Sequence, residues 1–101
     1  MTSQIVAITG AGRGIGAELS RYLAQAGFTV GVLDLSAENA HAVAEDIVSS
    51  GGSAHGFGVD VTDENGLKEL ATTLAAHGTI TGVVNNAALF QEFPYTEMQD
   101  I

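Results

Sequence analysis

Cysteine is absent from this 101-residue chain, proline occurs once, and basic residues number only three. Without cysteine there is no disulfide framework, no thiolate metal site and no cysteine nucleophile. The three Lys and Arg stand against twelve Asp and Glu, which gives a formal net charge of −9. Because nucleic acids and anionic membranes bind basic surfaces, this charge argues against either as a partner.

Long apolar runs are also missing, since no stretch approaches the roughly 20 residues that a membrane span requires. Met1 does not open a signal peptide, because there is no basic segment and the first apolar run soon reaches glycines. We therefore expect a cytoplasmic protein without a membrane partner. Hydrophobic residues make up 46% of the chain and charged residues 15%, an ordinary globular composition in a length that fits one domain.

Four short apolar segments alternate with longer segments of helical periodicity. The predicted strands are residues 5–8, 29–33, 54–61 and 82–84. The first, second and fourth lack polar alternation, which predicts strands that are covered on both faces. The third is weaker, because two glycines interrupt it.

Three complete helices are expected between these strands. The apolar positions that indicate them are 15, 19, 22, 23 and 26, then 40, 43, 44, 47 and 48, then 67, 70, 71 and 74. Ser36 and Asp63 are the predicted N-caps of the second and third helices, and Gly27 is the predicted C-terminal cap of the first. Thr96 with Gln99 resembles a capping box, which predicts the start of a fourth helix.

The order β-α-β-α-β-α-β, followed by the start of another helix, is typical of a parallel sheet with right-handed crossovers. We expect an α/β fold, a Rossmann-type doubly wound parallel sheet with strand order 3-2-1-4 that is incomplete at four strands. Residues 1–101 would form the N-terminal portion of such a domain. Its switch point lies between strands one and four, so ligand chemistry is expected at the carboxyl ends of those strands.

A glycine-rich loop, residues 9–16 (TGAGRGIG), follows the first predicted strand and opens the first predicted helix. A G-x-x-x-G-x-G pattern through Gly10, Gly14 and Gly16 fits it better than G-x-G-x-x-G, which would need glycine at Ile15. Glycine permits the tight turn and the approach of a pyrophosphate, and the helix start offers unpaired N–H groups. No Gly-Lys-Ser/Thr ending follows, which excludes a mononucleotide P-loop. The alternative is a tight turn with surplus glycine.

Charge is distributed unevenly along the chain. Residues 1–33 contain two arginines and one acid, a net charge of +1, whereas residues 34–101 contain eleven acids and one lysine, a net charge of −10. The acidity therefore avoids the loop where phosphates are expected to bind.

Asp34 ends the second predicted strand, 24 residues after Gly10 and 18 after Gly16. A carboxylate about 20 residues beyond such a loop accepts hydrogen bonds from the adenosine ribose and repels a 2′-phosphate. Arg13 acts in the opposite sense, because its guanidinium pairs well with phosphate. We expect the carboxylate to dominate, which favours NAD over NADP. The alternative is that Asp34 is a strand-end turn residue or helps to cap the next helix.

Two further segments follow the third and fourth predicted strands. Asp60 is placed to accept from the exocyclic amine of adenine and Val61 to pack against the ring. Asp60 would otherwise form a turn before the helix cap. In the segment 85–88 (NNAA), two amides are placed to bridge neighbouring strand ends and the ribose region. Those asparagines would otherwise be loop residues that satisfy their own backbone.

Together, the loop at 9–16, Asp34, the pair 60–61 and the segment 85–88 resemble the short-chain dehydrogenase/reductase family. Their order and spacing match from residue 5 to about residue 90. The resemblance implies an NAD(P)-dependent oxidoreductase that interconverts an alcohol and a ketone and assembles as a homo-oligomer, a dimer or tetramer. It assigns cofactor contacts to Gly10, Gly12, Arg13, Gly14, Ile15, Gly16, Asp34, Asp60, Val61, Asn86 and Ala87.

The chain departs from the family pattern in two ways. Ala88 stands where the family usually has glycine, which is a mild difference. The family's catalytic Ser and Tyr-x-x-x-Lys are missing, since Tyr22 is followed four residues later by Ala26 and Tyr95 by Gln99. In the family the tyrosine exchanges a proton with the substrate oxygen and the lysine lowers its pKa. We therefore assign no catalytic residue and expect the N-terminal, cofactor-binding half of such an enzyme.

A rival hypothesis from another functional class fits the same motifs. A non-catalytic dinucleotide-binding module, such as a redox sensor or a truncated relative, would also need the glycine loop and the acid after strand two. A Ser and a Tyr-x-x-x-Lys beyond residue 101 would favour the enzyme.

Three histidines, His41, His55 and His77, fall on different predicted elements. They are too scattered in sequence for a metal cluster. We expect structural roles for all three and predict no metal site.

Overall fold

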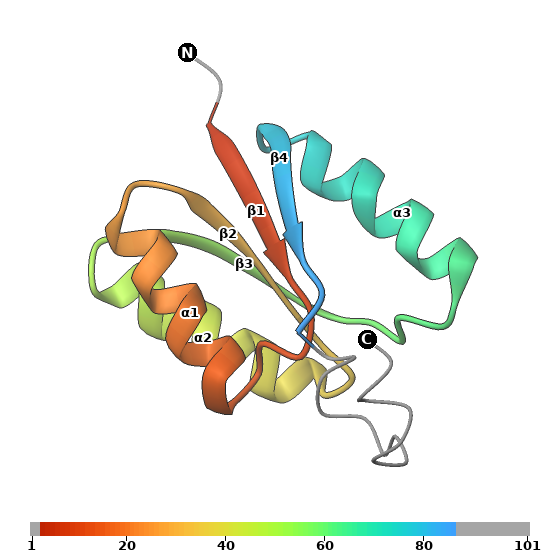
Figure 1. Cartoon of the computed structure of the whole chain (residues 1–101), viewed down its shortest axis with the longest axis horizontal. Helices are drawn as coiled ribbons and strands as arrows, with labels where there is room; N and C mark the ends of the chain where they lie inside the picture. The colour runs from red at the N-terminus through yellow and green to blue at the C-terminus, as the bar shows by residue number, and fades with distance from the viewer. Residues whose placement is uncertain (1–2, 87–101) are drawn as a thin grey trace, which may run out of the picture.

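Strands and helices alternate along residues 3–86, the part of the chain that the computed structural model describes (Figure 1). The elements are β1 (Gln4–Ile8), α1 (Gly14–Gln25), β2 (Thr29–Asp34), α2 (Ala37–Ser49), β3 (Ser53–Gly58), α3 (Glu64–Ala75) and β4 (Thr79–Val84). The predicted alternation of strands and helices is confirmed. The capping box predicted at Thr96 and Gln99 lies outside the described residues.

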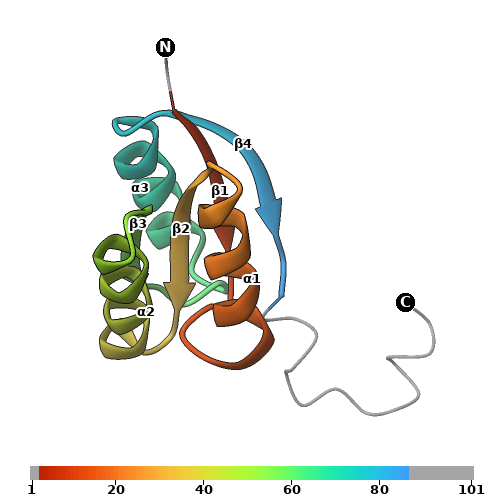
Figure 2. The same cartoon turned by 90° about the vertical axis from the view of Figure 1, so that its left-hand side faces the viewer.

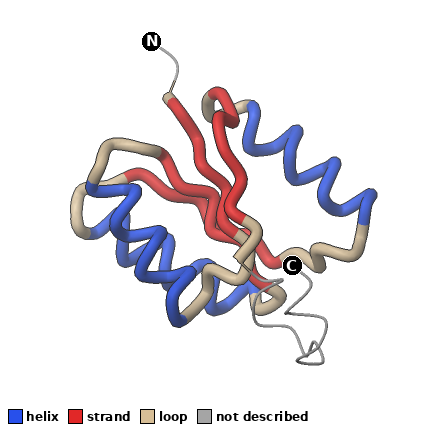
Figure 3. The backbone as a smooth tube through the Cα atoms, viewed as in Figure 1, coloured by secondary structure: helices blue, strands red, loops and turns tan. Residues whose placement is uncertain are grey.

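The four strands form one parallel sheet in the order β3-β2-β1-β4, as predicted. Helices α1 and α2 cover one face and α3 lies on the opposite face (Figures 1 and 2). Because the strands are parallel, the loops that follow them gather at one end of the sheet (Figure 3). This end of the sheet carries the residues of the motifs predicted to bind a ligand.

The two central strands, β1 and β2, are buried on both faces, as their continuous apolar sequence predicts. Successive residues of β1 face opposite sides, so Ile5 packs with the α3 cluster and Val6 with the α1 and α2 cluster. The largest fully buried apolar side chains of the two strands are Ile5, Ile8, Val30 and Val32. Burying each one contributes about 1.5–3 kcal/mol, which anchors the sheet beneath the loops.

Strand β4 differs from the prediction in length and burial. It begins at Thr79, three residues before the predicted segment, because the Thr79 amide donates to the Ser3 carbonyl at 2.8 Å. Its residues alternate between exposed and half-buried, and Val83 is 66% exposed. The prediction of a strand covered on both faces was wrong for the described residues, in which β4 pairs with β1 alone.

Strand β3 ends at Gly58, three residues before the predicted limit. The Val59 amide still donates to the Asp34 carbonyl at 2.8 Å, but the chain then turns, and the Asp63 amide donates to the Asp60 carbonyl at 2.9 Å. Asp60 and Val61 therefore belong to this turn and not to the strand.

Helix α1 buries a different face from the predicted one. Ile15 and Tyr22 are 64% and 67% exposed, while Leu19 and Leu23 are half-buried against the core. The buried residues are small, namely Gly16, Ala17, Ser20 and Ala24. Small side chains allow the helix to lie close to the sheet and the glycine loop, a constraint that apolar periodicity does not register.

The predicted helix caps are confirmed. The Ser36 hydroxyl accepts from the Asn39 amide at 3.1 Å, and the Asp63 carboxylate accepts from the Gly66 amide at 3.1 Å. Gly27 follows the end of α1 with a φ of 105°, the left-handed conformation that glycine adopts readily.

Candidate functional site

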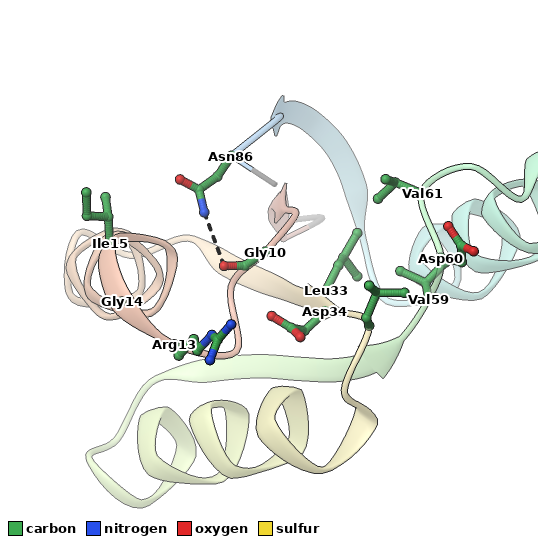
Figure 4. A pocket seen from close by; sticks show the side chains of 11 residues that line it. Gly10, Arg13, Gly14, Ile15, Leu33, Asp34, Val59, Asp60, Val61 and Asn86 are labelled. Atoms are coloured by element: carbon green, nitrogen blue, oxygen red, sulfur yellow. Dashed lines mark hydrogen bonds between the residues drawn. The ribbon is translucent and has the colours of Figure 1, made fainter. Parts of the chain in front are cut away.

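A cavity of about 520 Å³ lies at the carboxyl ends of β1 and β2, between the glycine loop and the loop after β3 (Figure 4). It is lined by Gly10, Arg13, Gly14, Ile15, Leu33, Asp34, Leu35, Val59, Asp60, Val61 and Asn86. The structure thus brings together eight of the eleven residues predicted for the cofactor. Gly12 and Gly16 lie beside the cavity without lining it, and Ala87 lies outside the described residues.

The glycine loop passes from β1 into α1 through two residues with positive φ, Gly10 at 64° and Gly14 at 61°. Arg13 between them has extended backbone and forms the N-cap of α1 without a side-chain hydrogen bond. The first turn of α1 contains no acidic residue. The helix therefore presents its partial positive charge and amide groups to the cavity side of the loop, an arrangement that suits an anion.

Gly16 explains the close contact between α1 and the loop. A Cβ at this position would collide with the Gly10 carbonyl oxygen and would lie 2.7 Å from Asn86 Nδ2 and 2.9 Å from Ala11 Cα. Two of these three neighbours are backbone atoms, which move only if the loop moves. The glycine predicted for cofactor binding at this position thus serves the packing of the loop on the helix.

Asp34 is fixed at the end of β2 by backbone amides from two elements. Its Oδ2 accepts from the Gly12 amide at 2.9 Å, and its Oδ1 accepts from the Ser36 amide at 3.0 Å. The neighbouring Leu33 carbonyl accepts from the Ala11 amide at 2.8 Å. Asp34 therefore forms the strand-end turn that was the alternative interpretation, and it also lines the cavity where the ribose was predicted.

Two asparagines connect the end of β4 to the loop after β1. The Thr9 hydroxyl lies 3.3 Å from Asn85 Oδ1, and Asn86 Nδ2 donates to the Gly10 carbonyl at 3.1 Å (Figure 4). Asn86 is only 5% exposed. The predicted bridge between neighbouring strand ends is therefore present.

Asp60 lies across the cavity from the glycine loop (Figure 4). Its Oδ1 accepts from the Thr62 hydroxyl at 2.7 Å and from the Thr62 amide at 2.9 Å. These two hydrogen bonds, the hydroxyl first, lower the pKa of Asp60 below its ordinary value. The carboxylate thus forms the turn named as the alternative and lies at the cavity wall beside Val61.

Three apolar lining residues were not identified from the sequence: Leu33, Leu35 and Val59. Leu35 is 78% exposed although it is a large apolar residue directly after Asp34. The sequence did contain one signal for Leu35. It is a large apolar side chain in a short connection between a strand and a helix, where burial in the core does not account for it. With Val61, these residues give the cavity an apolar wall that suits a flat aromatic ring.

No group of three His, Asp or Glu side chains among residues 3–86 is arranged to hold a metal ion. No helix in this range is both long and apolar enough to cross a membrane.

Comparisons with known proteins agree with the geometry. The chain is 38% identical over 92 residues to a 2,5-dichloro-2,5-cyclohexadiene-1,4-diol dehydrogenase of Sphingobium indicum, covering 90% of this chain and 36% of that enzyme. The chain spans about a third of the length of the curated relatives that it matches.

Solved structures superpose on most of the chain. A metagenomic short-chain oxidoreductase in complex with NADP matches with a TM-score of 0.76 and 37% identity, over 85% of this chain and 39% of that one. A putative D-mannonate oxidoreductase from Haemophilus influenza with bound NAD also gives 0.76, at 30% identity, over 82% of this chain and 30% of that one. A model of the family described as short chain dehydrogenase matches residues 4–101. The chain therefore belongs to the short-chain dehydrogenase family.

Proposed function

We propose that this chain is the dinucleotide-binding part of an NAD-dependent oxidoreductase that acts on an alcohol or ketone. The names of its relatives support the reaction class, since they are dehydrogenases of hydroxylated compounds. When bound, the nicotinamide ring of the cofactor accepts or donates the hydride. This chain's residues bind and orient the cofactor, and the family's Ser and Tyr-x-x-x-Lys would have to lie outside the 101 residues.

The pyrophosphate would lie against the start of α1. Gly10 and Gly14 shape the loop there, and the absence of acidic residues from the first turn of α1 avoids repulsion. Arg13 lines the same cavity and adds a positive charge at its edge. Helix N-termini with free amides bind phosphate groups through this combination of geometry and dipole.

The adenosine would occupy the side of the cavity beyond the loop. Asp34 would accept from the ribose hydroxyls, and the ring would pack among Leu35, Val59 and Val61, with Asp60 beside its amine. A 2′-phosphate would bring further negative charge next to Asp34, so NAD is favoured over NADP. The observation that carries this proposal is the position of Asp34, in the cavity and hydrogen-bonded to the glycine loop.

Titration of the intact protein with NADH and NADPH tests this assignment. We expect NADH to bind more tightly, and Asp34→Ala to raise the affinity for NADPH relative to NADH by about tenfold, equivalent to ~1.4 kcal/mol. Glu38→Ala is a matched control, because Glu38 is an exposed acid at the start of α2 that does not line the cavity. An NADPH/NADH preference that is the same in the native protein and Asp34→Ala would contradict the proposal.

A further inference from the structure

The carboxylate of Asp34 accepts hydrogen bonds from two separate segments of the chain. Its Oδ2 accepts from Gly12 in the glycine loop, and its Oδ1 accepts from Ser36 at the start of α2. The carboxylate is therefore held in one orientation, and so is the loop residue that it contacts.

We propose that Asp34 holds the glycine loop in the conformation that binds the phosphates, in addition to selecting NAD over NADP. The inference rests on the proposed function, because the loop is taken as the phosphate site. Asp34 acts on the phosphates only through Gly12 and the backbone next to it, so in that respect it is a positioning residue.

The packing around Gly12 shows how closely the loop approaches Asp34. A Cβ on Gly12 would lie 2.8 Å from the Asp34 carboxylate and 2.8 Å from Asn39 Cβ. Only a residue without a side chain fits between the loop, the end of β2 and the first turn of α2. The short distance allows a charge-assisted hydrogen bond, which is about twice as strong as one between neutral groups.

Three contacts hold successive residues of the loop, one from the segment after β4 and two from the end of β2. Asn86 bonds the Gly10 carbonyl, the backbone of β2 bonds the Ala11 amide, and Asp34 bonds the Gly12 amide. Asp34 is the contact nearest to Arg13, where α1 begins. Its loss would release the segment that aligns the helix start with the cavity.

The two roles of Asp34 do not compete for the same lone pairs. An ionised carboxylate offers about four acceptor positions. The Gly12 and Ser36 amides occupy two of them. The remaining two suffice for the two hydroxyls of an adenosine ribose, so the contact with the loop persists when the cofactor is bound.

Amide hydrogen exchange in the cofactor-free intact protein tests the proposal directly. In Asp34→Ala we expect the Gly12 amide to exchange at least about tenfold faster than in the native protein, because it loses its acceptor. Asp34→Asn keeps one carbonyl oxygen at the same reach, so the acceleration should be smaller. Amides of β1 and β2 report whether each variant is folded, and Glu38→Ala serves as the charge control.

Binding of 2′,3′-dideoxyadenosine diphosphate provides a second readout. This ligand has no ribose hydroxyls, and Asp34→Asn and Asp34→Ala carry the same charge. Asp34→Asn retains a side-chain oxygen that can accept from the loop and Asp34→Ala has none, so we expect Asp34→Asn to bind the ligand about threefold more tightly. Equal affinities, or a Gly12 amide that exchanges no faster in the folded variants, would overturn the proposal.

The outcome separates this inference from the proposed function. If the native protein binds neither NADH nor NADPH while Gly12 exchange accelerates in the variants, the proposed function is wrong, and Asp34 orders the loop without positioning it for a dinucleotide. If NADH binds but exchange at Gly12 is unchanged, the positioning role is wrong and the function stands. Should Asp34→Ala fail to fold, Asp34→Leu replaces it, because leucine has a similar branched shape and no acceptor atom.

Discussion

Asp34 is the last residue of β2, and Asp60 follows the neighbouring strand β3. The two acids look alike in the sequence, but their surroundings in the structure differ. Asp34 accepts from amides of the glycine loop and of the start of α2. Asp60 accepts from Thr62 only two residues away, and both of those hydrogen bonds end on one oxygen. Asp34 thus fixes the shape of the site, whereas Asp60 fixes its own turn at the cavity wall.

At the residue scale, Gly16→Ala tests the close contact between α1 and the loop. We expect destabilisation by about 2 kcal/mol, because a methyl group would collide with the Gly10 carbonyl oxygen. This destabilisation is larger than the roughly 1 kcal/mol by which alanine is favoured over glycine in a helix. Urea unfolding of the intact protein measures the change.

Gly82→Ala is the matched control for that substitution. A Cβ on Gly82 would meet Val6 at 3.9–4.0 Å, an ordinary van der Waals distance. We expect its effect to stay within about 0.5 kcal/mol. A Gly16→Ala variant as stable as the control would contradict the packing described for the loop.

At the scale of elements, the sequence predicts what depends on local chemistry. The strand order was predicted from the doubly wound pattern that the β-α-β alternation indicates, and the caps at Ser36 and Asp63 follow from side chains that reach amides three residues away. The buried face of α1 was predicted wrongly, because close approach to the loop selects small residues over large apolar ones. The early end of β3 was also missed, since Asp60 closes its turn through a side-chain contact that apolar patterning ignores.

The residues of the candidate site were likewise predicted only in part. The glycines and acids were identified because their residue types carry the chemistry of phosphate and ribose binding. Leu35 and Val59 were missed because apolar residues next to a motif look like core residues in a sequence. The contact between Asp34 and Gly12 was also out of reach, because it depends on two loops meeting in space.

A pair of histidines joins the edge strand β3 to the end of α3. The rings of His55 and His77 stack with centroids 4.1 Å apart. Burial, and secondly the charge of His77, lower the pKa of His55 below its ordinary value. His41 and Glu45 of α2 line the same hollow at this edge. The folded protein therefore disfavours a proton on His55.

Because of the His55–His77 pair, we expect the folded protein to lose stability as the pH falls. A histidine whose pKa is lower in the folded state stabilises the protein above its ordinary pKa of about 6.5, and this contribution is lost as the pH falls. The free energy of unfolding should drop between pH 7.5 and 5.5, and the drop should be smaller in His55→Gln and His77→Gln. His41→Gln is the control. Identical pH dependence in all variants would contradict the effect of the pair.

At the scale of the whole molecule, charge and length indicate what this chain contributes. The net charge of −9 is concentrated after residue 33, so the glycine loop and α1 lie in the less acidic part. Arg21 of α1 is paired with Asp46 and Glu18, whereas Arg13 lines the cavity. The chain spans about a third of its curated relatives, and its part of the shared fold contains the predicted dinucleotide site.

The catalytic activity of residues 1–101 expressed alone can also be predicted from the proposed function. We expect no turnover of NADH with ketones, because no tyrosine here has a lysine four positions later. A spectrophotometric assay of NADH oxidation measures this, with a family member that carries the Tyr-x-x-x-Lys pair as the positive control. Reductase activity from the isolated 101 residues would show that other groups in this chain carry out the proton transfer.

The central claim is that Asp34 and the glycine loop together form a dinucleotide site that prefers NAD. A crystal structure of the intact protein with NADH tests it most directly. We expect the adenosine ribose hydroxyls within hydrogen-bonding distance of Asp34, with the pyrophosphate at the start of α1 and the Gly12 contact to Asp34 retained. A cofactor bound elsewhere, or with its ribose turned away from Asp34, would contradict the claim.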